Sequence, residues 1–285
     1  MIAELLLILH LYNIKQVIMK SQKLYEADDK LISLIKDNYN VLQSLGAFGI
    51  NLGFGDKTVR EVCEMQDVDT YTFLAIVNLA INGYKSFEDF SKISIPTLMH
   101  YLHASHEYYL DFQLPFIRKE LVDALDENDN LARLILKLYD EYADEINKHM
   151  RYEERYLFPY VESLLNGNPI KNYDIETFSK HHGQTDQKLR ELKNIIIKYL
   201  PSDGLHNNQL SATLCDIYSN EEWLARHADV EEIIMIPAIR FLERKSKQSD
   251  VSAKISNMIS QNANSGEALS EREKDVIVSL VQGMT

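Results

Sequence analysis

Apolar residues recur at helical spacing from residue 96 to residue 244, and polar residues fill the positions between them. Three short stretches rich in Asn, Asp, Gly or Pro interrupt this pattern, at 126–129, 166–169 and 201–204. They divide the region into four segments, each of bundle-helix length. Because short connections join antiparallel neighbours, the pattern predicts an all-α fold built on an up-down-up-down four-helix bundle.

The regions outside this bundle are predicted separately. Residues 1–23 form an N-terminal extension, which is either a short amphipathic helix or a stretch preceding a natural start at Met19. Its apolar run is too short to span a bilayer and lacks the basic start of a signal peptide, so we expect no membrane contact. Residues 246–268 are rich in Ser, Asn, Lys and Gln, which predicts a linker with a short helix near 251–259.

Composition narrows the class of protein. The chain has ten Gly and six Pro in 285 residues, too few for a many-stranded sheet fold. Its two Cys exclude a disulfide scaffold and fit a reducing, cytoplasmic location. The formal net charge of −13 makes the whole chain a poor nucleic-acid binder, whereas its excess carboxylates could bind cations.

The second and fourth bundle segments repeat each other. Residues 149–159 and 227–237 both read His, three residues, Glu-Glu, four residues, Pro. Residues four apart share one face of a helix, and here that face is the apolar stripe. The pairs that project together are His149 with Glu153 and His227 with Glu231.

A buried Glu beside a His needs compensation for its charge. One interpretation is a buried His–Glu hydrogen bond on each helix, and the other is metal coordination, which neutralises the carboxylates. Two related pairs, with His on both remaining segments, favour metal.

The other two segments supply further His residues. In the first segment His106 falls within the apolar stripe and is the predicted ligand. His103 occupies a neighbouring position one turn earlier, beside the ligands, and His100 lies at the periphery. The stripe of the third selects His182 and leaves His181 at its edge. The predicted ligand set is therefore His106, His149, Glu153, His182, His227 and Glu231. Four His and two Glu are more ligands than one tetrahedral zinc ion binds, and they suit two metal ions that both carboxylates bridge.

These residues carry a family resemblance. The two His-x-x-x-Glu repeats, each closed by Pro, together with His106 and the following Leu114-Pro115, resemble the haemerythrin-like superfamily and, within it, the RIC (repair of iron centres) group. The resemblance implies an oxo-bridged di-iron centre on the six predicted ligands, in a cytoplasmic bacterial protein. Spacing alone does not separate iron from manganese or a mixed pair. The bundle domain is placed at residues 94–245.

The resemblance extends towards the N-terminus, with one departure. Residues 24–85, including 45–55 and 58–63, resemble the small helical domain that precedes the bundle in RIC proteins. That group carries adjacent Cys near the positions of Asn51 and Leu52, and this chain has neither. Cys63 lies among apolar residues and is expected to be buried. A step that needs a thiol pair is therefore in doubt.

The C-terminal stretch resembles a different family. Residues 269–285, with a Leu-Ser-x-Arg-Glu start and a Leu-Val-x-Gly-x-Thr turn, resemble the opening of a LuxR-type helix-turn-helix. A capped helix is the simpler interpretation. No recognition helix precedes Thr285, so DNA would be bound only through a complete domain that this chain lacks.

Three functions are compatible with these features. The first hypothesis is a sensor, in which dioxygen, nitric oxide or redox stress acts on the di-iron site and biases a LuxR-type transcriptional regulator. The alternative is repair of iron–sulfur proteins by iron donation, or binding and storage of iron or oxygen. No substrate-pocket residues can be named, which favours a protein that is not an enzyme.

Overall fold

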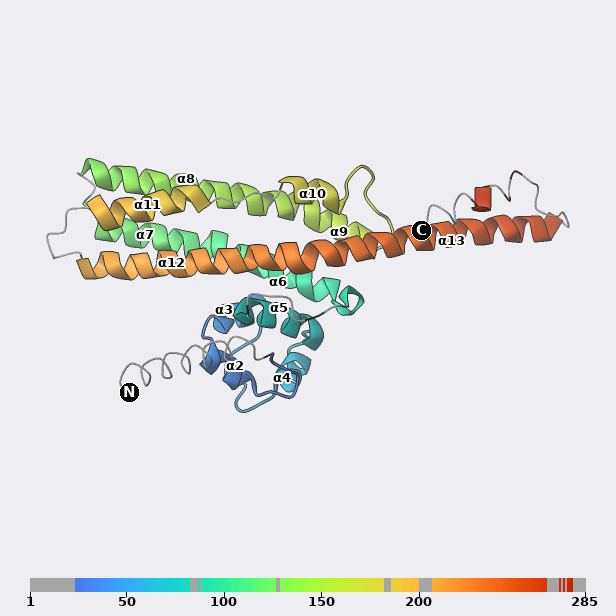
Figure 1. Cartoon of the computed structure of the whole chain (residues 1–285), viewed down its shortest axis with the longest axis horizontal. Helices are drawn as coiled ribbons and strands as arrows, with labels where there is room; N and C mark the ends of the chain where they lie inside the picture. The colour runs from blue at the N-terminus through green and yellow to red at the C-terminus, as the bar shows by residue number, and fades with distance from the viewer. Residues whose placement is uncertain are drawn as a thin grey trace, which may run out of the picture.

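The computed structural model describes residues 24–82, 87, 89–126, 129–181, 186–199, 207–265, 272, 274 and 276–278. Within these residues the chain is helical apart from turns and one isolated bridge between Lys30 and Thr58. Long helices lie side by side in a bundle, and a small group of short helices packs against its side (Figure 1). The predicted all-α class and bundle are confirmed.

Each predicted bundle segment is a rod of two α-helices in the structure, and in the first, second and fourth rods a π-helical turn lies between the two. The first comprises α6 (Ile95–Glu107), η2 (Tyr108–Gln113) and α7 (Leu114–Ala124); the second α8 (Asn130–Tyr152), η3 (Glu153–Leu157) and α9 (Phe158–Leu165); the third α10 (Ile175–His181) and α11 (Asp186–Tyr199); the fourth α12 (Asn207–Val230), η4 (Glu231–Met235) and α13 (Ile236–Ser265). Side chains cap two of the starts: Ser94 accepts from the Thr97 amide, and Asp129 accepts from the Leu131 amide. The predicted interruptions therefore coincide with real helix ends.

The segments η2, η3 and η4 are π-helical turns inside otherwise α-helical rods. Each is followed within two residues by a proline, namely Pro115, Pro159 and Pro237. Proline has no amide hydrogen and its ring clashes with the carbonyl four residues earlier, so an undisturbed α-helix cannot continue through it. The wider π turn accommodates the proline, and the helix runs on.

The small helical group comprises α2 (Leu31–Asp37), α3 (Val41–Ala47), α4 (Val59–Met65) and α5 (Thr70–Asn82). Thr58 and Glu61 form a reciprocal capping box at the start of α4. Helix α3 packs on α6, and α5 packs on α12. The rings of Phe48 and Tyr101, 4.7 Å apart between centroids, join this group to the bundle.

The buried apolar residues form two separate clusters. One joins the small helical group to the end of the bundle made by α6, α9 and the start of α13. The other fills the opposite end, between α7, α8, α11 and α12. Both clusters end near the middle of the bundle, where polar side chains take over.

The C-terminal region differs from the prediction. Helix α13 continues without interruption from the bundle to Ser265, so residues 246–265, expected as a linker with a short helix, are part of one long helix. Residues 1–23 lie outside the described residues, as do most of residues 269–285. No helix among the residues placed by the structure has the length and apolar character needed to cross a membrane.

Candidate metal centre

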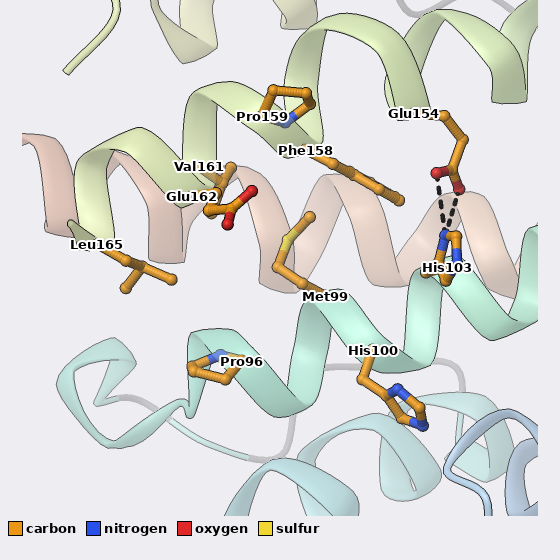
Figure 2. A pocket seen from close by; sticks show the side chains of 10 residues that line it. All are labelled: Pro96, Met99, His100, His103, Glu154, Phe158, Pro159, Val161, Glu162 and Leu165. Carbon is orange, nitrogen blue, oxygen red and sulfur yellow. Dashed lines mark hydrogen bonds and ion pairs between the residues drawn. The ribbon is translucent and has the colours of Figure 1, made fainter. Parts of the chain in front are cut away.

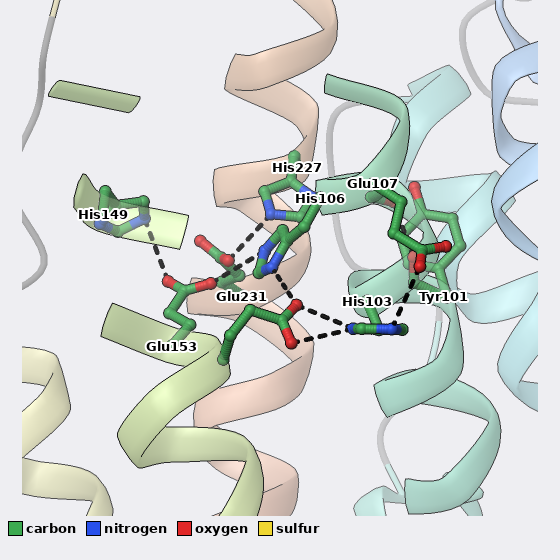
Figure 3. Close-up of polar contacts among 10 residues, drawn as sticks. Tyr101, His103, His106, Glu107, His149, Glu153, His227 and Glu231 are labelled. Atoms are coloured by element: carbon green, nitrogen blue, oxygen red, sulfur yellow. Dashed lines mark hydrogen bonds and ion pairs between the residues drawn. The ribbon is translucent and has the colours of Figure 1, made fainter. Parts of the chain in front are cut away.

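Four of the predicted ligands meet in the middle of the bundle (Figure 3). They are His106 from α6, Glu153 from η3, His227 from α12 and Glu231 from η4. One potential ligand atom from each lies within 4.8 Å of those of the other three. All four are buried, with exposed fractions between 0% and 3%.

Helical spacing creates the contacts within each repeat. The Nε2 atom of His227 lies 3.0 Å from Oε1 of Glu231, four residues later. The Nε2 atom of His149 likewise lies 3.0 Å from Oε1 of Glu153. The second oxygen of Glu153 lies 3.0 Å from Nε2 of His106, so this carboxylate bridges imidazoles from two helices.

The donor set fits a cation better than it fits simple hydrogen bonds. Among the described residues, Nε2 of His106, both carboxylate oxygens of Glu153 and both ring nitrogens of His227 are buried without a hydrogen-bond partner. Their 3.0 Å contacts have the distance of a hydrogen bond but not its alignment. Buried carboxylates and imidazoles without hydrogen-bond partners lower the stability of the fold, and a cation bound between them would interact favourably with all of them.

The remaining predicted ligands differ in how well they are defined. His149 touches Glu153, but its side chain is 27% exposed and so it lies at the edge of the centre. His182 lies outside the described residues, as does the side chain of His181. Their roles stay predictions. His100 is exposed, as expected for a peripheral residue.

Sequence reasoning missed Glu154. Its Oε1 atom lies 2.8 Å from Nδ1 of His106, and its two oxygens each lie 2.9 Å from Nδ1 of His103 (Figure 2). The predicted neighbour His103 therefore reaches the centre through Glu154 rather than directly. A carboxylate on the outer nitrogen of a ligating imidazole fixes its tautomer and orientation. The signal for this role was the Glu-Glu doublet in the repeat.

The carboxylates control the protonation of the imidazoles. Burial lowers the pKa of His106, but the contacts with Glu153 and Glu154 outweigh it and raise the pKa to about 9. Burial also lowers the pKa of His149, and Glu153 raises it by more. Burial raises the pKa of Glu154, but the hydrogen bonds with His106 and His103 lower it by more, so the pKa lies below its usual value. A metal cation at this centre would take the place of the proton on His106.

Aromatic side chains enclose the centre. The ring of Phe158 stacks on His106 at 5.4 Å between centroids and an interplanar angle of 10°. On the other side, the fully buried ring of Tyr109 lies 6.3 Å from that of His227 and 4.5 Å from that of Trp223. These rings exclude water, which strengthens electrostatic interactions between ligands and cation.

Cys63 lies on α4 of the small helical group and not on the rods that carry the centre. Asn51 and Leu52, at the positions where the RIC group has adjacent Cys, are exposed on the small helical group. Cys63 is 1% exposed, and burial raises the pKa of its thiol to about 12. The prediction of a buried structural Cys63 is confirmed, and a thiol with so high a pKa is a weak nucleophile.

Comparison with known proteins adds two findings. A family model described as the hemerythrin HHE cation binding domain matches residues 97–239, half of the chain. The iron-sulfur cluster repair protein ScdA of Staphylococcus haemolyticus (strain JCSC1435) is 21% identical over 153 residues, covering 52% of this chain and 68% of that protein. No solved structure matches the chain. Neither finding supports the LuxR-type helix-turn-helix predicted for residues 269–285.

Proposed function

Because the chain belongs to the hemerythrin HHE cation binding domain family, we propose that its bundle holds two iron ions and donates iron to damaged iron–sulfur proteins. The residues that would hold the ions are His106, His149, Glu153, His182, His227 and Glu231. The iron is then cargo for a recipient protein rather than a catalyst.

The buried cluster of two His and two Glu is the observation that carries this proposal. Two carboxylates offset much of the charge of two divalent ions, and the mixed oxygen and nitrogen donors suit iron among the transition metals. Glu153 contacts imidazoles on two different helices and is therefore placed to link two ions.

The chemistry of donation follows from this donor set. Bound iron supplies a transferable redox-active ion. The chain's own residues bind it with imidazole and carboxylate groups, which exchange ligands more readily than thiolates would with this hard or borderline cation. The resemblance to a protein described as an iron-sulfur cluster repair protein favours donation over storage. Nothing in the comparisons favours a transcriptional regulator.

Iron content tests the metal part of the proposal. Purified protein should hold close to two iron ions per chain and absorb visible light, and Glu153→Ala should lose both properties. Glu232→Gln is the matched control, because Glu232 is the exposed second Glu of the other repeat. A wild type without iron, or a Glu153→Ala variant with a normal two-iron centre, would contradict the proposal.

Reactivation of an iron–sulfur enzyme tests the repair part. The enzyme is first inactivated by an oxidant that removes iron from its cluster, then mixed with iron-loaded protein, metal-free protein or loaded Glu232→Gln, with the same excess of a chemical reductant in every sample to supply the electron that cluster rebuilding needs. We expect activity to return with the two loaded proteins alone. Ferrous salt at the same iron concentration shows how much recovery free iron gives, and equal recovery with this salt rules out donation by the protein.

A further inference from the structure

A cavity of about 410 Å³ lies between α6 and α9, beside the centre (Figure 2). Most of its wall is apolar, including Pro96, Met99 and Val161. Its polar lining comprises His100, Glu162 and the pair formed by His103 and Glu154, whose side chains are in contact. The cavity therefore combines access from the surface with an imidazole and a carboxylate, two groups of the kind that bind metal ions.

The His103–Glu154 pair connects the cavity to the buried centre. The side chain of His103 is 50% exposed, that of Glu154 is 22% exposed and that of His106 is 2% exposed. Glu154 contacts both imidazoles through the same oxygen, at 2.9 Å and 2.8 Å. Nitrogen and oxygen ligands thus form a series from solvent to the ligand His106.

Phe158 lies where the cavity meets the centre. Its ring lines the cavity and stacks flat on His106, which is a member of the buried cluster. A rotation of this one side chain would uncover His106 from the cavity. Phe158 is half-buried, so its ring has space on the cavity side that the fully buried Tyr109 lacks.

We propose that this cavity is the port through which a divalent metal ion enters and leaves the buried centre. The ion first binds His103 and Glu154, with water completing its coordination. The Phe158 ring then turns aside, and the ion leaves Glu154, passes the imidazole of His106 on the side that Phe158 uncovers, and binds Nε2 of His106 and Glu153. Each step exchanges one ligand for another without electron transfer. The identity of the ion as iron rests on the proposed function.

Exchange kinetics test the port. The protein is loaded with Co²⁺ or Fe²⁺, and release to a chromogenic chelator is followed after mixing, with loading measured in the reverse experiment. We expect His103→Ala to slow loading and release by the same factor, about tenfold, which is the lower end of the range by which substitutions beside metal ligands reduce the activity of metal sites. Phe158→Leu should accelerate both rates, and Met99→Trp, which fills the cavity, should slow both.

The metal content at equilibrium separates this route from a structural role. Because His103 does not contact the cluster directly, His103→Ala should hold as much metal as wild type once exchange is complete. Glu232→Gln changes an exposed side chain that does not line the cavity and should exchange at the wild-type rate. Circular dichroism confirms that each variant is folded.

Two results would overturn the port. One is a wild-type exchange rate in both His103→Ala and Met99→Trp while each holds metal. The other is an equilibrium metal content in His103→Ala as low as in Glu153→Ala, which would make His103 part of the centre itself. A wild type that binds cobalt through this port but no iron contradicts the proposed function and leaves the port intact.

Discussion

The two His-x-x-x-Glu-Glu repeats have the same sequence pattern but different surroundings. In the fourth rod, His227 and Glu231 are both buried, and the second Glu, Glu232, faces solvent. In the second rod, Glu153 is buried, whereas His149 is 27% exposed and Glu154 contacts two imidazoles on α6. The pattern therefore places the predicted ligands, and contacts with the neighbouring helix determine the surroundings of the other residues in the repeat.

This difference divides the centre into a sealed half and an accessible half. The repeat at 227–237 is covered by Trp223, Tyr109 and the small helical group. The repeat at 149–159 borders the cavity between α6 and α9. We infer that the second repeat anchors the ions and the first controls their exchange.

The largest expected effect comes from removing the carboxylate of either repeat. If both repeats serve one centre, Glu153→Ala and Glu231→Ala should each abolish the stabilisation that iron gives to the fold. For free iron at 100 times its dissociation constant this stabilisation is about 2.7 kcal/mol, or about 5–10 °C in melting temperature. Calorimetry with and without iron measures it. A variant that keeps the full iron-dependent shift would show that its repeat is not part of the centre.

The pH dependence is the next largest effect, and it concerns the repeat at 149–159. In the metal-free protein the pKa of His106 is raised to about 9. The charged imidazole therefore contributes fully to the free energy of unfolding below about pH 6.5, the pKa of a His in the unfolded chain. That contribution is lost as the pH rises through 9. Iron affinity should change in the opposite direction, weakening about tenfold per pH unit as acid restores that proton.

Chemical unfolding of the metal-free protein between pH 6 and 9, and iron titrations over the same range, measure these two trends. Glu153→Gln should flatten the first trend, because Glu153 is among the groups that raise the pKa of both His106 and His149. Stability of the metal-free wild type that increases from pH 7 to pH 9 would contradict the assignment.

The smallest effect distinguishes the two ligand imidazoles by burial. In the metal-free protein, His227→Ala removes a side chain that is 3% exposed and should cost about 2 kcal/mol of unfolding free energy through the cavity it leaves. His149→Ala removes a side chain that is 27% exposed and should cost less than about 1 kcal/mol. Urea denaturation compares the two, and equal losses would refute the division into sealed and accessible halves.

Helical periodicity accounts for the parts of the structure that sequence predicted. The i, i+4 spacing placed His149 with Glu153 and His227 with Glu231, and the apolar stripe selected His106 over His100. The four rods followed from their interruptions, because capping residues and turn residues are local signals. The ligand role of His182 remains a prediction.

Other features depend on contacts between helices or on competing local signals. The contact of Glu154 with His103 requires the distance between α6 and the second rod, which no spacing along one helix contains. Residues 246–265 have a polar composition that favours a linker, yet the sequence has no Gly or Pro between Pro237 and Gly266 to end the helix. The prolines were visible, but the π turns that precede them were not.

The placement of the polar layer between two apolar clusters also affects how the fold comes apart. Each cluster is continuous within its own end of the bundle, and the buried His and Glu residues of the candidate centre belong to neither cluster. Such a boundary separates cooperative units that open with different free energies, as seen in amide hydrogen exchange. In the metal-free chain we expect the two ends to exchange as distinct groups. Metal ions bound in the polar layer would join the two ends into one cooperative unit. Binding of the ions should therefore increase the protection of amide hydrogens from exchange at both ends of the rods.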